Sequence, residues 1–272
     1  MSEKRITAAD LTAMKSRGEK ISVLTAYDYG WGRLIDEAGI DVALVGDSLG
    51  MVVLGYDATL QVTMEDMVRH TAAVARGAKR ALVVGDMPYL SYQISEEDAL
   101  RNAGRLIQEA NAGAVKLEGG AAVAQTVRRL VDIGIPVVGH VGMTPQSVHQ
   151  LGGYRMQGED AENAKRIAHE AAVLQESGAC AVVLELIPDD LAKQVTDSLV
   201  IPTIGIGAGP DCDGQVLVTH DVLGMYDRLK PSFVKQYANL WQITLDAFRA
   251  YNEDVKRGAF PERRRRRRSN ET

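Results

Sequence analysis

The sequence predicts an α/β fold, a (β/α)8 TIM barrel with an N-terminal capping helix and a C-terminal helical extension. Eight short runs rich in Val, Ile and Leu recur along the 272 residues. Most of them are continuous rather than alternating, as expected for parallel strands buried on both faces. Helix-like segments separate the runs, and no linker-like break precedes the C-terminal tail. A doubly wound open sheet is the alternative, because periodicity does not show whether a sheet closes.

The eight apolar runs define the expected strands and the domain. A single barrel domain is expected over residues 1–262, followed by an arginine-rich tail, residues 263–272, that we expect to be solvated and disordered. The expected strands are residues 21–27, 42–47, 81–86, 114–119, 136–142, 181–187, 202–207 and 216–222.

Cap residues delimit the expected helices between these strands. Thr63 begins one helix and Ser95 another, each followed by acidic residues that suit the positive end of a helix. Gly178 ends a third helix. The last apolar segment, residues 232–258, either packs on its own barrel, which is the interpretation we favour, or contacts another subunit. The expected helices are residues 7–19, 63–79, 95–112, 122–134, 158–178 and 232–258, the first of them closing the bottom of the barrel.

Composition excludes several classes of protein. The chain is 46% hydrophobic and 25% charged, with a net charge of −5. Without the six arginines of Arg263–Arg268, 25 basic residues face 36 acidic ones, a charge of −11, which argues against nucleic acid as the main partner. No apolar stretch approaches the ~18 residues of a membrane span, and the charged start is unlike a signal peptide. The two cysteines, Cys180 and Cys212, give no sign of an oxidising compartment, so a cytoplasmic location is expected.

Polar residues gather where the expected strands end, at the face of a barrel that carries catalytic residues. Lys116 and Glu118 are spaced i, i+2, so both side chains point into the barrel mouth. Strand seven ends in "GIGAG" (205–209), which is either part of the site or a tight turn. The candidate residues from the other strands are Asp47 and Ser48, Asp86, His140 and Glu185.

Three of these acids, together with the lysine and the histidine, outline a site for a hard cation at the barrel mouth. Mg²⁺ takes few protein carboxylates and leaves room for an oxygen-bearing substrate, so Asp47 and Asp86 fit as ligands, with Glu118 nearby. Each aspartate alone would more simply cap a turn. The same Gly-Asp ending, however, closes two neighbouring apolar runs, at Gly46-Asp47 and at Gly85-Asp86, and this repetition favours a shared site between the two carboxylates. Lys116 and Glu118 are equally consistent with a structural ion pair, and His140 with a hydrogen-bonded core residue.

Glu185 stands within the apolar run "VVLELIP", where a carboxylate is costly to bury without a function. An apolar setting raises the pKa of a carboxyl group toward that of a useful general base. The residues therefore indicate a Mg²⁺-dependent enzyme that enolises a small 2-oxo acid. The metal would polarise the carbonyl, one of the carboxylates would act as a base and remove the neighbouring proton, and Lys116 would hold the anionic substrate.

Six motifs closely resemble the ketopantoate hydroxymethyltransferase family, over about residues 3 to 262 in continuous order. The resemblance implies transfer of a one-carbon unit from 5,10-methylenetetrahydrofolate to 3-methyl-2-oxobutanoate, and a homo-oligomer, commonly a decamer. The arginine-rich tail falls outside it. The motifs are "GDSLGMVVLGYDAT" (46–59), "GDMPY" (85–89), "VKLEGG" (115–120), "GHVGMTPQS" (139–147), "LELIP" (184–188) and "TIGIGAGPDCDGQVLV" (203–218).

The resemblance also implies roles for individual residues. Mg²⁺ would be bound through Asp47 and Asp86, with Glu118 close or linked by water, and the oxo acid would chelate it. Ser48 and Lys116 would hold the substrate carboxylate. Glu185 would take the proton from C3, whereas His140 lies in a family motif with its role open.

Two other functions remain as alternatives. A Mg²⁺-dependent carbon–carbon lyase of the phosphoenolpyruvate mutase and isocitrate lyase type would also stabilise an enolate, but the Lys-Lys-Cys-Gly-His stretch of isocitrate lyases is missing from the sequence. A barrel retained as a binding or scaffold protein would usually have lost one of the acids, and all of them are present.

Overall fold

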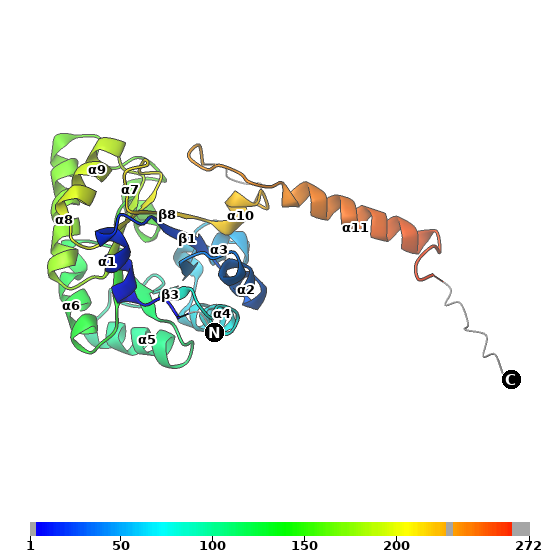
Figure 1. Cartoon of the computed structure of the whole chain (residues 1–272), viewed down its shortest axis with the longest axis horizontal. Coiled ribbons are helices and arrows are strands. Elements are labelled where there is room, and N and C mark those ends of the chain that lie inside the picture. The colour runs from blue at the N-terminus through cyan, green and yellow to red at the C-terminus, as the bar shows by residue number, and fades with distance from the viewer. Residues whose placement is uncertain (1–3, 227–230, 263–272) are drawn as a thin grey trace. The chain divides into compact units, whose positions relative to one another are not determined.

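Eight parallel strands close into a barrel in the computed structural model, which describes residues 4–226 and 231–262. Each strand pairs with the next along the chain, and β8 pairs with β1, so the predicted (β/α)8 barrel is confirmed and the open sheet is excluded (Figure 1). The strands are β1 Ile21–Thr25, β2 Val42–Val45, β3 Leu82–Asp86, β4 Ala114–Lys116, β5 Val137–Gly142, β6 Ala181–Glu185, β7 Thr203–Ile206 and β8 Gly214–Leu217.

Two helices begin at the caps that the sequence indicates, whereas the last helix, expected from residue 232, begins only at Leu240. Thr63 and Asp66 form a reciprocal capping box at the start of α4, and the Ser95 hydroxyl accepts a hydrogen bond from the backbone N–H of Asp98 in α5. The helices are α1 Ala8–Ser16, α2 Tyr29–Glu37, α3 Leu49–Val52, α4 Met64–Gly77, α5 Glu96–Gln108, α6 Ala124–Asp132, α7 Val148–Leu151, α8 Ala161–Glu176, α9 Asp189–Ser198, α10 Thr219–Val222 and α11 Leu240–Lys256, with short 3-10 turns η1 Thr59–Gln61, η2 Ala121–Val123 and η3 Pro145–Ser147.

The last strand differs from its expected position. Residues 216–222 were expected to form it, but β8 ends at Leu217 and a helical turn, α10, begins at Thr219. Pairing starts earlier, at Gly214, where a Cβ atom would lie 2.5 Å from the carbonyl oxygen of Ile21. The apolar run does not reveal this start, because glycine is selected there for a close backbone approach rather than for hydrophobicity.

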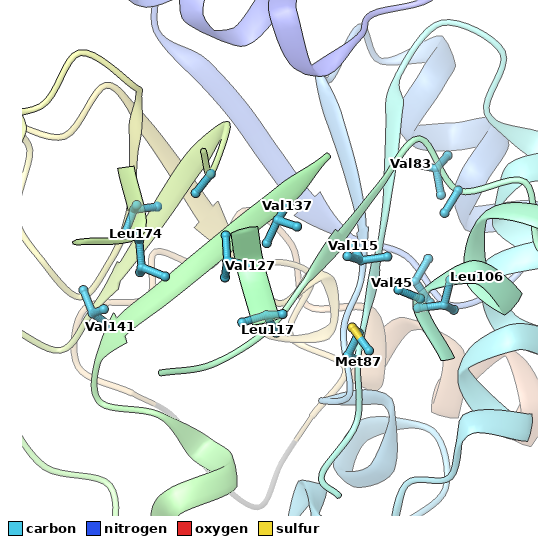
Figure 2. Packing of buried hydrophobic residues seen from close by; sticks show 14 of the residues in the cluster. Val45, Val83, Met87, Leu106, Val115, Leu117, Val127, Val137, Val141 and Leu174 are labelled. Atoms are coloured by element: carbon cyan, nitrogen blue, oxygen red, sulfur yellow. The ribbon is translucent and has the colours of Figure 1, made fainter. Parts of the chain in front are cut away.

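Alternate strand residues build two apolar layers. One row, including Val42, Leu44 and Val84, fills the barrel interior. The other row, including Val45 and Val83, packs outward against the helices (Figure 2). The interior row is the one that continues into the barrel mouth.

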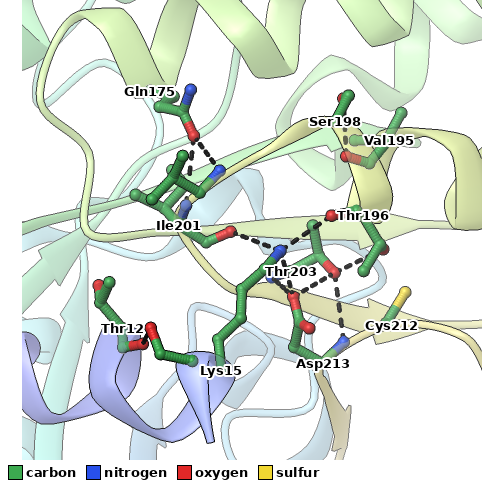
Figure 3. Close-up of polar contacts among 12 residues, drawn as sticks. Thr12, Lys15, Gln175, Val195, Thr196, Ser198, Ile201, Thr203, Cys212 and Asp213 are labelled. Atoms are coloured by element: carbon green, nitrogen blue, oxygen red, sulfur yellow. Dashed lines mark hydrogen bonds and ion pairs between the residues drawn. The ribbon is translucent and has the colours of Figure 1, made fainter. Parts of the chain in front are cut away.

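Helix α1 closes the bottom of the barrel, as predicted. Its Leu11 is buried among the interior residues. Nζ of Lys15 forms an ion pair with Asp213 at 2.9 Å and donates hydrogen bonds to the carbonyl oxygens of Thr196 and Ile201 (Figure 3). The helix is therefore tied to the chain at the starts of β7 and β8.

The chain divides into two compact units, one ending at Thr219 and one beginning at His220. The second unit contains α11, capped by Asn239, and the single domain predicted over residues 1–262 stays a prediction. Both cysteines are free thiols, and among the described residues no helix is long and apolar enough to cross a membrane. The predicted disordered tail, residues 263–272, lies outside the described residues.

Candidate active site

Most of the predicted site residues continue the interior-facing rows of the strands. On β4 and just beyond it, Lys116 and Glu118 both face inward and both are buried. Strands β3 and β4 pair Asp86 directly with Lys116, so these side chains are neighbours on one face. The interior rows are Leu82, Val84 and Asp86; Ala114, Lys116 and Glu118; Val138 and His140; and Ala181, Val183 and Glu185.

Asp47 reaches the site by a different route from Asp86. It lies two residues beyond β2, in a turn, and its backbone N–H donates to Oδ2 of Asp86 at 3.1 Å. A Cβ atom on Gly46 would lie 2.7 Å from Oγ of Ser48, whereas one on Gly85 would point outward to the helices. The two Gly-Asp endings therefore meet as their repetition suggests, but only the first glycine serves the site.

Lys116 forms its ion pair with Asp86 rather than with Glu118. Nζ lies 3.0 Å from Oδ1 of Asp86 and 3.4 Å from Nδ1 of His140. Burial alone would lower the pKa of Lys116, but the carboxylates of Asp86, Glu118 and Asp47 raise it, so the ammonium group stays charged.

His140 lies between two of the acids. Its Nε2 is 3.2 Å from Oε2 of Glu185, and its Nδ1 is 3.7 Å from Oε1 of Glu118. Burial, followed by the charge of Lys116, lowers the pKa of His140, so the ring is neutral at pH 7. The side chain of Glu185 is 15% exposed against 3% for Glu118, which makes Glu185 the more accessible acid to an incoming substrate.

The buried carboxylates carry more negative charge than Lys116 can balance. Burial raises the pKa of Asp86 to about 7 despite the opposing effect of Lys116, and it also raises the pKa values of Asp47 and Glu118. Oε1 of Glu118 is buried and accepts no hydrogen bond from any residue that the structure describes. An oxygen-rich site with excess negative charge suits a hard dication such as Mg²⁺.

The acids do not form a complete ligand set by themselves. In the part of the chain that the structure describes, no three Asp, Glu, His or Cys side chains converge as a metal site. A cation there would thus depend on oxygens from water or substrate as well, which is the usual situation for Mg²⁺.

Three buried polar residues that no sequence pattern pointed to also contact this cluster. Tyr27 shares a hydrogen bond of 2.9 Å with Oγ of Ser48. Gln146 and Tyr92 contact Asp47 and Glu118, as described below. Gln146 lies in the motif "GHVGMTPQS", but on sequence alone it is indistinguishable from a residue of the turn.

Comparison with known proteins gives consistent relatives over nearly the whole chain. The profile of the family described as ketopantoate hydroxymethyltransferase matches residues 5–263. The chain is 58% identical over 258 residues to 3-methyl-2-oxobutanoate hydroxymethyltransferase of Moorella thermoacetica, covering 95% of this chain and 96% of that protein. The enzyme of the same name from Syntrophus aciditrophicus is 57% identical over 259 residues, covering 95% of each.

Solved structures share the fold at much lower identity. A 2,3-dimethylmalate lyase of the PEP mutase/isocitrate lyase superfamily has a TM-score of 0.61 at 16% identity, covering 96% of this chain and 92% of that chain. A phosphoenolpyruvate phosphomutase from Streptomyces platensis has a TM-score of 0.62 at 13% identity, covering 93% and 88%. These likenesses concern the barrel, whereas the profile and the close relatives define the family. The chain belongs to the ketopantoate hydroxymethyltransferase family.

Proposed function

We propose that the chain transfers a hydroxymethyl group to 3-methyl-2-oxobutanoate, giving 2-dehydropantoate, the step that its relatives' name describes. The donor would be 5,10-methylenetetrahydrofolate. The methylene carbon would form a bond to C3 of the oxo acid, water would supply the hydroxyl oxygen, and tetrahydrofolate would leave. The observation that carries this proposal is the 58% identity to a hydroxymethyltransferase across 95% of the chain.

The acid cluster supports a dependence on Mg²⁺. Asp47 and Asp86 would hold the ion, with Glu118 close to it, since these buried carboxylates have raised pKa values. Bound Mg²⁺ would act as a Lewis acid that favours charge on the ketone oxygen of the substrate.

Glu185 would act as the general base that takes the proton from C3. It is the more exposed acid of the cluster, and the neutral ring of His140 beside it would keep its carboxylate in place. Lys116 and Ser48 would bind the carboxylate of the oxo acid. Lys116 suits this role because it stays charged although it is buried.

Hydrogen–deuterium exchange at C3 of 3-methyl-2-oxobutanoate, followed by NMR in D₂O, tests the base. We expect exchange that requires Mg²⁺ and falls at least 100-fold in Glu185→Gln, a loss within the range typical of general-base catalysis. Metal binding should be kept. The matched control, Glu176→Gln, changes an exposed acid on α8 and should exchange like the wild type. Wild-type exchange in Glu185→Gln would assign the base to another residue.

Folate dependence separates the proposal from the lyase alternative. Product formation from 3-methyl-2-oxobutanoate should require the folate, whereas a lyase would cleave its own substrate with no folate present. The homo-oligomeric state, commonly a decamer in the family, and the cytoplasmic location remain part of the proposal.

A further inference from the structure

The side-chain amide of Gln146 is held at both ends. Its Nε2 donates to Oδ2 of Asp47 at 2.9 Å and to the carbonyl oxygen of Met87 at 3.0 Å. Its Oε1 accepts from the hydroxyl of Tyr92 at 2.7 Å and from Nε2 of Gln93 at 3.1 Å. Reversing the amide would oppose donor to donor and acceptor to acceptor, so the network fixes its orientation.

The same pair of residues also holds Glu118. The backbone N–H of Gln146 donates to Oε2 of Glu118 at 2.9 Å, and the backbone N–H of Glu118 donates to the Tyr92 hydroxyl at 3.1 Å. Tyr92 is 3% exposed and Gln146 7% exposed, so neither bond competes with bulk water. Segments that follow β3, β4 and β5 are thereby linked at the two acids.

We propose that Gln146, oriented by Tyr92, is a positioning residue that aligns the carboxylates of Asp47 and Glu118 for a divalent cation. The inference rests on the proposed function, because it assigns those acids to the metal. A hydrogen bond to one carboxylate oxygen fixes the rotation of the whole group and hence the direction of its other oxygen. Neither residue needs to touch the cation for this effect, which is how outer-shell partners tune metal sites.

The side chain and the backbone of Gln146 act on different acids, and this allows a selective variant. Gln146→Met keeps the length of the side chain and the backbone N–H to Glu118, but it removes the bond to Asp47. Tyr92→Phe removes the hydroxyl that orients the amide and accepts from the Glu118 N–H. The matched control is Gln175→Met, because Oε1 of Gln175 also accepts two hydrogen bonds, from the N–H groups of Val200 and Ile201 at the opposite end of the barrel (Figure 3).

The experiment measures Mn²⁺ binding to the full-length, substrate-free protein by electron paramagnetic resonance, with Mg²⁺ competition. Unfolding temperatures are recorded separately without metal. We expect Gln146→Met to raise the Mn²⁺ dissociation constant about 10-fold, within the range for loss of an outer-shell partner. Tyr92→Phe should raise it less, and Gln175→Met should lower only the unfolding temperature.

Each result decides the inference. Dissociation constants within twofold of the wild type in both site variants would overturn it, as would an equal loss of affinity in Gln175→Met. If Gln146→Met does not fold, Tyr92→Phe alone decides between these outcomes. A wild-type protein that binds no Mn²⁺ would reject the metal assignment of the proposed function itself, which distinguishes the two failures.

Discussion

The backbone at Glu185 leaves no room for a side chain on Gly142, the residue of β5 that pairs with it. Gly142 has a φ of +95°, and a Cβ atom there would lie 2.3 Å from the carbonyl oxygen of Glu185 and 2.8 Å from Cγ2 of Ile187. Directly after Glu185, Leu186 has a φ of +45°, which is unfavourable for a residue with a side chain. Strain of this kind persists only where the surroundings impose it. The position of Glu185 is therefore set by its neighbours on both strands.

Gly142→Ala should displace this backbone and impair the site. We expect a loss of about 1–2 kcal/mol from the left-handed conformation and about 1–3 kcal/mol more from overpacking, with slower exchange at C3. Urea denaturation and the NMR exchange assay measure the two effects.

Gly134 offers the matched control for this variant. It has a φ of +89°, and no atom of the described residues lies within 4 Å of an added Cβ atom. Gly134→Ala should therefore show only the conformational cost and keep full exchange activity. Equal effects of the two substitutions on activity would show that the contact with Glu185 is unimportant.

At the scale of elements, local chemistry is readable in the sequence and long-range contacts are not. The Thr63 and Ser95 caps were predictable because capping depends on neighbouring residues. The i, i+2 spacing of Lys116 and Glu118 likewise predicted their common face. The pairing of Lys116 with Asp86 and the contact of Gln146 with Asp47 depend on strand register across the barrel, which no local pattern encodes.

The attachment of α1 to the barrel bottom gives a prediction at this scale. Lys15→Met removes an ion pair with Asp213 and two hydrogen bonds, at side chains only 16% and 17% exposed. It leaves the carbonyl oxygens of Thr196 and Ile201 without that donor, so we expect a loss of about 2 kcal/mol in the free energy of unfolding.

An exposed ion pair on α9 is the control for Lys15. Lys193 pairs with Asp197 at side chains 56% and 64% exposed, so Lys193→Met should change stability by less than about 0.5 kcal/mol. Both variants should keep the wild-type rate of C3 exchange. Lys15 is on α1, at the end of the barrel opposite the site, and Lys193 is exposed on α9. Urea denaturation that ranks them equally would mean that α1 contributes little to the barrel.

At the scale of the whole molecule, closure of the barrel depends on partners far apart in the chain. Val23 in β1 pairs with Val216 in β8. Continuous apolar runs suit both an open parallel sheet and a closed one, which is why the sequence favoured the barrel without excluding the alternative. Closure places the ends of all the strands in a ring and so concentrates the acids of several strands in one buried site.

This concentration of charge makes the stability of the metal-free protein depend on pH. Burial raises the pKa of Asp86 from 3.8 to about 7, so between these values the folded state binds more protons than the unfolded state. The free energy of unfolding should therefore decrease as the pH rises through 7. His140 acts in the opposite sense, since its lowered pKa adds stability as the pH rises toward 6.5, and that gain is largely complete above it.

Urea denaturation with a chelator at pH 6.5 and pH 8 measures the effect. At these pH values the cysteines of the unfolded chain are still mostly protonated, so they add little to the pH dependence. We expect lower stability at pH 8, a weaker pH dependence in Asp86→Asn, and recovery at pH 8 on adding Mg²⁺, because a ligand that binds only the folded state stabilises it. In Asp10→Asn the pH dependence of stability should match the wild type, since the hydrogen bonds that Thr7 donates to Asp10 lower the pKa of Asp10 to about 2. Stability that rises between the two pH values in the metal-free protein would show that the buried acids are balanced without a cation.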